Sequence, residues 1–163
     1  KNKWNPITKF PKEINTKSWE NFGSLSSNGD TLYFSSNREG GFGGFDIYMS
    51  TKTSTGEWTY PVNLGKNINT PFDEIAPFVT ENSKKLFFSS NGHITMGGFD
   101  LLYSNRNNNS WEIPLNLGAP LNTTDDDTFL FPVGNGNQGY LSKATAESGD
   151  EDIYFVKIDF STK

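Results

Sequence analysis

Acidic residues occur in pairs and short runs at similar places along the chain. Asp73-Glu74 and Asp125-Asp126-Asp127 lie a little over fifty residues apart, and Trp19-Glu20 precedes the first pair by the same distance. A ring of carboxylates could bind Ca²⁺ through its oxygen atoms or attract a basic peptide, and a solvated acidic rim is the alternative. The candidate binding residues are therefore Trp19, Glu20, Asp73, Glu74, Asp126 and Asp127.

Two further aspartates, Asp46 and Asp100, each follow a Gly-Gly-Phe sequence. They could ligate a metal ion, or their carboxylates could accept hydrogen bonds from backbone amides in the adjacent turn. Their recurrence favours the second role, because a single binding site seldom needs the same residue in every repeat. We assign this structural role to Asp46, Asp100 and their weaker counterpart Asp152, which falls in a charged turn, and we assign no metal ligand.

The remaining residue types do not favour catalysis. The chain has one histidine, His93, and no cysteine, so the usual transition-metal sites cannot be assembled. No Gly-rich phosphate loop or nucleophile elbow occurs. We expect His93 to be an exposed loop residue, and we expect no enzymatic activity and no cofactor, with Ca²⁺ as the one alternative.

The composition indicates a turn-rich globular protein. Hydrophobic residues make up only 33% of the 163 residues, but aromatic residues reach 15%, and large rings supply core area where aliphatic side chains are scarce. The net charge of −5, without a basic stripe, makes nucleic acid an unexpected partner. No apolar run is long enough to span a bilayer.

Three tandem repeats organise the chain. Residues 32–37 (Leu-Tyr-Phe-Ser-Ser-Asn) return 54 positions later as Leu-Phe-Phe-Ser-Ser-Asn at 86–91, and residues 43–47 (Gly-Gly-Phe-Asp-Ile) return as Gly-Gly-Phe-Asp-Leu at 97–101. A weaker third copy includes residues 139–142 and 152–154. The tryptophans Trp4, Trp58 and Trp111 follow the same spacing, which favours packing on outer strands over stacking against sugars.

Each repeat predicts four short strands and no helix. In the first repeat these are residues 23–26, 31–35 and 45–50, and a fourth that begins at Trp58 and ends near residues 63–65. Asn28-Gly29 predicts a type I′ hairpin turn between the first two. The chain would begin with the last strand of a preceding unit, around Trp4.

Four antiparallel strands at this repeat length predict all-β architecture of the β-propeller type, with each repeat forming one blade. The expected divisions are residues 1–20 (a last strand and link), 21–73 (blade 1), 74–126 (blade 2) and 127–163 (blade 3 without its last strand). The candidate carboxylates would then lie near the mouth of a central channel. Three blades are fewer than a closed ring needs, so the chain is either part of a larger propeller or half of a six-bladed ring completed by a homodimer.

Several motifs carry a resemblance to a known family. They are Gly-Asp-x-Leu-Tyr-Phe-Ser-Ser-Asn-Arg, Gly-Gly-Phe-Asp-Ile-Tyr, Trp-x-x-Pro-x-Asn-Leu-Gly and Ile-Asn-Thr-Pro-x-Asp-Glu. The chain resembles TolB-like, WD40-like (PD40-type) propellers that occur beside OmpA-family domains in outer-membrane-associated proteins of Bacteroidetes. The resemblance implies a periplasmic or outer-membrane-associated scaffold that binds a protein partner or a peptidoglycan-linked component.

A carbohydrate-binding or carbohydrate-active propeller is the alternative function. A glycosidase needs two carboxylates about 5 to 10 Å apart in one pocket. The candidates for this role are Glu20, Asp73, Glu74, Asp126 and Asp127.

Overall fold

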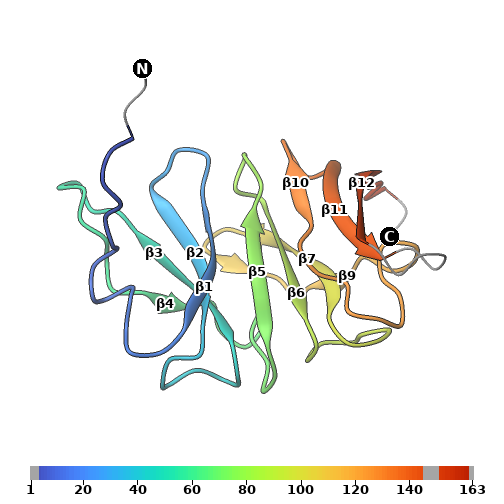
Figure 1. The fold of residues 1–163 in the computed structure, drawn as a ribbon, viewed down its shortest axis with the longest axis horizontal. Helices are drawn as coiled ribbons and strands as arrows, with labels where there is room; N and C mark the ends of the chain where they lie inside the picture. Colours follow the sequence, from blue (N-terminus) through green and yellow to red (C-terminus); the bar gives the residue numbers. More distant parts are fainter. Residues whose placement is uncertain (1–3, 145–150, 162–163) are drawn as a thin grey trace.

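A computed structural model describes residues 4–144 and 151–161 of the chain. Throughout this part the secondary structure is β, with no helix, and the strands form three antiparallel sheets. The sheets stand side by side in chain order (Figure 1). The described residues do not close into a ring.

Sheet I contains four strands in the order β1-β2-β3-β4. Their bounds are Glu20–Leu25 (β1), Thr31–Ser36 (β2), Asp46–Thr51 (β3) and Val62–Asn63 (β4). The turn between β1 and β2 is not of the predicted type I′, because only Gly29 of the Asn28-Gly29 pair has a positive φ, of 72°. Asn28 instead accepts hydrogen bonds through its side chain from Ser26 and from the Asp30 backbone, which builds a longer loop.

Sheet II differs from the predicted four strands, whereas sheet III contains three. Sheet II has five strands, namely Glu74–Val79 (β5), Lys85–Ser90 (β6), Asp100–Asn107 (β7), Ser110–Trp111 (β8) and Leu115–Asn116 (β9). The extra strand arises because the long β7 pairs with both β8 and β9. Sheet III has three strands, namely Phe131–Val133 (β10), Gln138–Ala144 (β11) and Glu151–Lys157 (β12).

The predicted fourth strands are shorter than expected. In sheet I only Val62 and Asn63 pair with β3, and Trp58 forms an isolated bridge to Lys52. Residues 4–10 form no strand, and the side chain of Trp4 is 98% exposed. The strand predicted there is therefore wrong for this structure, because none of the described strands lies alongside to supply hydrogen-bond partners.

Alternating side chains on the second strands of sheets I and II enter different cores. Leu32 and Phe34 pack with Ile14 from the N-terminal segment, whereas Tyr33 lies in the core between sheets I and II. In sheet II, Phe87 points into the core that it shares with Leu141 of sheet III. Both faces of the central sheet are thus buried, as expected for stacked repeats.

Two of the three repeated tryptophans have the predicted packing role. Trp111 is buried between sheets I and II, with its ring centroid 6.2 Å from that of Tyr33. Trp58 packs against Phe10 of the N-terminal segment, at a centroid distance of 5.5 Å. The packing role thus applies to Trp111 and Trp58, while Trp4 remains in solvent.

Candidate functional site

Glu74 is fully buried at the start of β5. Its Oε2 accepts the Thr70 backbone N–H at 2.8 Å, and its Oε1 accepts the hydroxyls of Thr70 at 2.7 Å and Ser90 at 2.8 Å. Burial raises the pKa of the Glu74 carboxyl, although the hydrogen bonds and the charge of His93 oppose this shift. The carboxylate ties the link before β5 to β6, and no part of it reaches solvent.

Glu20 and Asp127 occupy the same place in the other two sheets. Glu20 accepts the backbone N–H of Thr16 at 2.9 Å and its hydroxyl at 2.6 Å. Asp127 accepts the same two donors from Thr123. Three of the six candidate residues therefore fasten a link to a sheet in this structure, and a role in binding a ligand stays a prediction for them.

A basic side chain caps the same link in all three sheets, which the sequence comparison did not reveal. The Arg38 Nη2 lies 2.8 Å from the Ile14 carbonyl oxygen and 3.3 Å from Glu20 Oε1. The Lys143 Nζ lies 3.2 Å from the Leu121 carbonyl oxygen and 3.4 Å from Asp127 Oδ1. Three different residue types do the same work at slightly different positions, so a search for identical residues misses them.

His93 is the third member of this set. Its Nε2 donates to the Ile68 carbonyl oxygen at 2.9 Å, and its ring packs edge-on against Phe88 at a centroid distance of 5.9 Å. The expectation of an exposed loop residue is therefore wrong, because the loop after β6 folds back so that the half-buried imidazole covers the end of the core.

Asp73 and Asp126 connect each link to the sheet before it. Asp73 Oδ1 accepts the Phe45 backbone N–H at 2.7 Å, and Asp126 Oδ1 accepts the Phe99 backbone N–H at 2.8 Å. Trp19 is the residue at this place in the first link, and its side chain is 72% exposed. The six candidate residues are thus distributed over three separate links, two to each link.

The Gly-Gly pairs before these amides are required by close packing. A Cβ atom on Gly43 would lie 2.3 Å from the Pro71 carbonyl carbon, and one on Gly44 would lie 2.1 Å from Asp73 Oδ1. A Cβ on Gly97 would likewise lie 2.4 Å from the Thr124 carbonyl carbon. The motif therefore marks where a loop of one sheet rests on the link to the next.

Asp46 and Asp100 are buried at the starts of β3 and β7. The Oδ2 of Asp46 accepts the Phe42 backbone N–H at 2.6 Å and the Asn63 Nδ2 at 2.7 Å. Asp100 Oδ2 accepts the Met96 backbone N–H at 2.7 Å and the Asn116 Nδ2 at 2.6 Å. Each carboxylate thus joins a turn to the last strand of its sheet.

Asp152 differs from these two aspartates. It lies in β12, where it pairs with Lys143 of β11, and its side chain is exposed. Its assignment to a turn is wrong, because the ladder between β11 and β12 runs through it. Residues 149 and 150 of the predicted charged turn lie outside the described residues.

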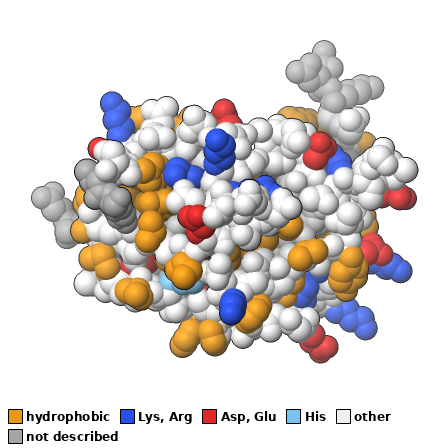
Figure 2. All heavy atoms as spheres, turned by 180° about the vertical axis from the view of Figure 1, so that it is seen from behind, with side chains coloured by type: hydrophobic (Ala, Val, Ile, Leu, Met, Phe, Trp, Pro, Cys, Tyr) orange, Lys and Arg blue, Asp and Glu red, His pale blue; other side chains and the backbone are white. Residues whose placement is uncertain are grey.

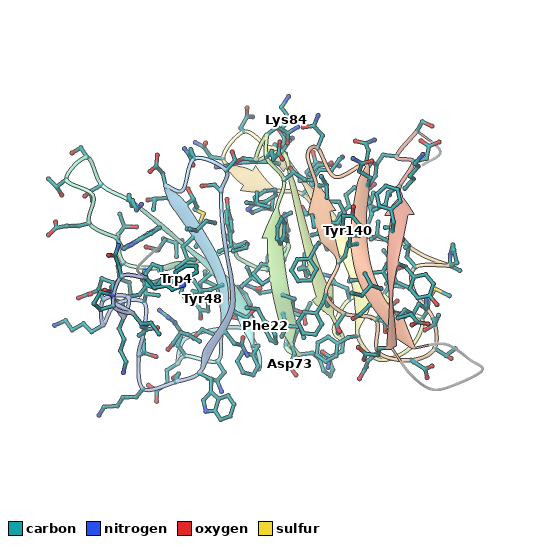
Figure 3. All side chains as sticks on the ribbon, turned by 45° about the horizontal axis from the view of Figure 1, so that its top comes forward. Trp4, Phe22, Tyr48, Asp73, Lys84 and Tyr140 are labelled. Atoms are coloured by element: carbon teal, nitrogen blue, oxygen red, sulfur yellow. The ribbon has the colours of Figure 1, made fainter. Side chains whose placement is uncertain are left out.

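A groove that the sequence did not predict runs along the first strands of the three sheets. It has a volume of about 320 Å³. Figure 3 shows one of its residues, Phe22, beside β1 and facing the neighbouring sheet. The lining residues are Phe22, Gly23, Ser24, Leu25, Ala76, Pro77, Phe78, Phe129, Leu130 and Phe131.

Three residues with left-handed backbone shape this groove. Phe22, Ala76 and Phe129 occupy equivalent places in the three units and have φ angles of 51°, 52° and 62°. The register of β1 with β2 shifts between Asn21 and Ser24, as expected for a β-bulge. These residue types rarely adopt positive φ, and such backbone strain is often found at functional positions. No sequence signal identifies them, since neither Phe nor Ala favours this conformation.

A second hollow, of about 1080 Å³, lies on sheet III. Its lining combines carboxylates with aromatic rings, and it includes two of the candidate residues. The acidic residues are Asp125, Asp126, Asp127, Glu151 and Asp152, and the aromatic residues are Phe129, Tyr154 and Phe155.

Neither a metal-binding cluster nor a membrane-spanning helix is found in the part of the chain that the structure describes. Within residues 4–144 and 151–161, no three His, Asp or Glu side chains are grouped so that they could hold a metal ion. The same residues include no helix that could cross a membrane. Binding of Ca²⁺ remains a prediction.

A scan against protein-family models found no matching family, and a search of curated proteins found no match. The geometry of the links, the groove and the hollow is therefore the basis for proposing a function.

Proposed function

We propose that the chain is a non-enzymatic interaction module of the β-propeller type, and that its groove binds an extended apolar segment of a partner protein. The propeller assignment is supported by three sheets, each preceded by a link of the same construction that is fastened by a carboxylate at Glu20, Glu74 or Asp127.

The groove is the observation that carries this function. Its lining residues have no titratable side chain and include one hydroxyl, that of Ser24, so it offers mainly apolar surface and backbone groups and no general acid or base. Phe22 and Leu25 are 37% and 49% exposed, and Phe131 is 54% exposed. Partly exposed aromatic rings in a concave site are typical anchors for a protein partner.

The strand edges beside the groove suit an extended segment. β1, β5 and β10 are each the edge strand of their sheet, so one side of each strand has backbone groups outside its own ladder. An extended chain can use such groups while its side chains enter the groove.

Selection of displayed peptides against the purified chain tests this function, followed by calorimetry of the peptides obtained. We expect Ala76→Asp to weaken their binding by about tenfold or more, because it places a charge in an apolar site. Asp tolerates a left-handed backbone better than Ala does, so this variant should fold.

Ser83→Asp is the matched control, because Ser83 also has a positive φ, of 54°, and lies outside the groove. Peptides that bind both variants as tightly as the unmodified chain would overturn the proposal. So would a failure to select any peptide.

We also infer a periplasmic or outer-membrane-associated setting, with a protein or a peptidoglycan-linked component as the partner. This inference is supported by the resemblance of the repeat motifs to envelope-associated propellers. Cosedimentation with purified peptidoglycan separates the two kinds of partner: binding to bare peptidoglycan favours a direct envelope ligand, and its absence favours a protein.

A saccharide ligand is the second candidate, and the hollow on sheet III favours it. Aromatic rings and carboxylates on one surface are suited to stacking against a sugar and to accepting its hydroxyl hydrogen bonds. A glycan array with and without Ca²⁺ tests this function. Loss of a specific signal in Asp126→Ala, with the signal retained in Asp73→Ala, would place a saccharide in this hollow.

A further inference from the structure

Sheet III exposes a face that the other two sheets bury. Tyr140 and Ile153 are 48% and 82% exposed. Their counterparts in sheet I are Tyr33 and Ile47, which are 1% and 0% exposed because sheet II covers them. Figure 3 shows Tyr140 on sheet III, and Figure 2 shows hydrophobic side chains gathered at this end of the molecule.

Sheet III also differs from sheet I at one strand edge. In sheet I, β3 pairs with β4 through Tyr48–Asn63 and Met49–Val62. β12 corresponds to β3, but among the described strands it pairs only with β11. No described strand of this chain therefore takes, in sheet III, the place that β4 occupies in sheet I.

The N-terminal segment has the conformation expected of a chain that has just formed a fourth strand. The amides of Ile14 and Asn15 donate to the Pro11 carbonyl oxygen at 3.0 and 2.9 Å. The amides of Ile68 and Asn69, which follow β4, donate to the Gly65 carbonyl oxygen at 3.0 and 2.9 Å. Residues 11–15 thus already have the conformation of the link that follows a fourth strand.

Two polar side chains indicate the register. Asn63 donates to Asp46 in sheet I, and the residues at these places are Lys9 in the N-terminal segment and Asp152 in sheet III. Lys9 and Asp152 are both exposed and carry opposite charges. A segment added to β12 in the register of β4 would bring them together as an ion pair.

The face that would cover sheet III is also present. Sheet II covers sheet I with Leu86, Phe88 and Leu102. Sheet I has Leu32, Phe34 and Tyr48 at the equivalent places, where they are buried together with Ile14 of the N-terminal segment. One end of the chain therefore resembles the surface that the other end lacks.

We propose that copies of this chain associate head to tail, with residues 8–15 of one copy completing sheet III of the next copy along the edge of β12. Tyr140 and Ile153 would pack against the sheet I surface of the incoming copy. Such a contact joins two different surfaces, so the copies either close into a ring or extend as a filament. The proposal is independent of the groove.

Sedimentation velocity of the purified chain over a concentration series tests the association. We expect a dimer or a larger assembly that Ile153→Asp dissociates, because the substitution places a charge on the docking face. A monomer at every concentration overturns the proposal, as does an assembly that Ile153→Asp leaves unchanged.

Charge exchange tests the register separately. We expect Lys9→Glu and Asp152→Lys each to weaken the association by about fivefold to tenfold, and the double variant to restore it. Lys12→Glu is the control, since it makes the same charge change on an exposed residue three positions away. Equal effects of Lys9→Glu and Lys12→Glu would overturn this pairing, while circular dichroism of each variant verifies that it is folded.

Discussion

Asn69 binds both backbone groups of Ile47 through its side-chain amide. Its Oδ1 accepts the Ile47 N–H at 2.8 Å, and its Nδ2 donates to the Ile47 carbonyl oxygen at 3.0 Å. Asn122 makes the same pair of hydrogen bonds to Leu101, at 2.8 and 2.9 Å. An asparagine side chain thus takes the place of a strand residue at the edges of β3 and β7.

Asn69→Ala should therefore destabilise the protein by about 1–3 kcal/mol, because it leaves the buried Ile47 N–H without a partner, while the Ile47 carbonyl oxygen keeps the Leu64 N–H at 3.0 Å. Urea unfolding measures the difference. Asn109→Ala, at an exposed position in the turn between β7 and β8, should change the free energy of unfolding by no more than about 0.5 kcal/mol. Similar losses in the two variants would contradict the role assigned to Asn69.

Gly43→Ala should also destabilise the fold, by about 2–3 kcal/mol, because the new methyl group would overlap the backbone of residues 70–72. Gly23→Ala is the comparison, since a Cβ there has its nearest neighbour at 3.6 Å. Thermal unfolding of both variants measures the effect. A Gly43→Ala protein as stable as Gly23→Ala would show that the loop does not rest on the link as described.

Ser83→Gly should stabilise the protein by about 0.5–1 kcal/mol. Ser83 has a φ of 54°, at the place where the first repeat has Gly29 with a φ of 72°. Glycine adopts this conformation without the steric cost that an L side chain incurs, and this gain exceeds the loss in unfolded-state entropy. Gly29→Ser should have the opposite effect. Chemical denaturation of both variants measures the two changes in the free energy of unfolding.

Glu74 should make the stability depend on pH. Burial raises the pKa of its carboxyl in the folded state above the ordinary value of 4.5, so folding favours the protonated form. The contribution of Glu74 is therefore fully present below pH 4.5 and is lost as the pH rises through the folded-state pKa.

Glu74→Gln removes this dependence and can keep the hydrogen bonds, because the hydroxyls of Thr70 and Ser90 can rotate to accept from the new amide. The free energy of unfolding of the unmodified chain, relative to Glu74→Gln, should fall as the pH rises from acid to neutral. Glu81→Gln, at an exposed turn residue, controls for loss of a negative charge. Parallel pH profiles for the unmodified chain and Glu74→Gln would contradict the prediction.

Repetition and alternation predicted the all-β fold, the three sheets and the faces of their strands. Leu32 and Phe34 enter one core and Tyr33 enters another, as the period of two requires. Strand numbers were less predictable, because short last strands depend on a neighbour: β7 continues far enough to pair twice, whereas residues 4–10 have no strand beside them.

The candidate site was predictable only as a set of recurring residues. Sequence spacing grouped Glu20, Glu74 and Asp127 with more exposed neighbours such as Asp126, but their different environments depend on which side chains reach the link. The contact of His93 with Ile68 could not be predicted for the same reason, since the two residues are far apart in the sequence. The left-handed Phe22, Ala76 and Phe129 carry no sequence signal at all.

The sequence by itself determined that similar segments form similar sheets, because hydrogen-bond ladders and side-chain alternation depend on residues close together in the chain. Only the tertiary structure decided which carboxylates are buried, where the groove lies and which sheet face stays uncovered. These properties depend on contacts between segments far apart in the chain, and residue spacing within one repeat does not specify them.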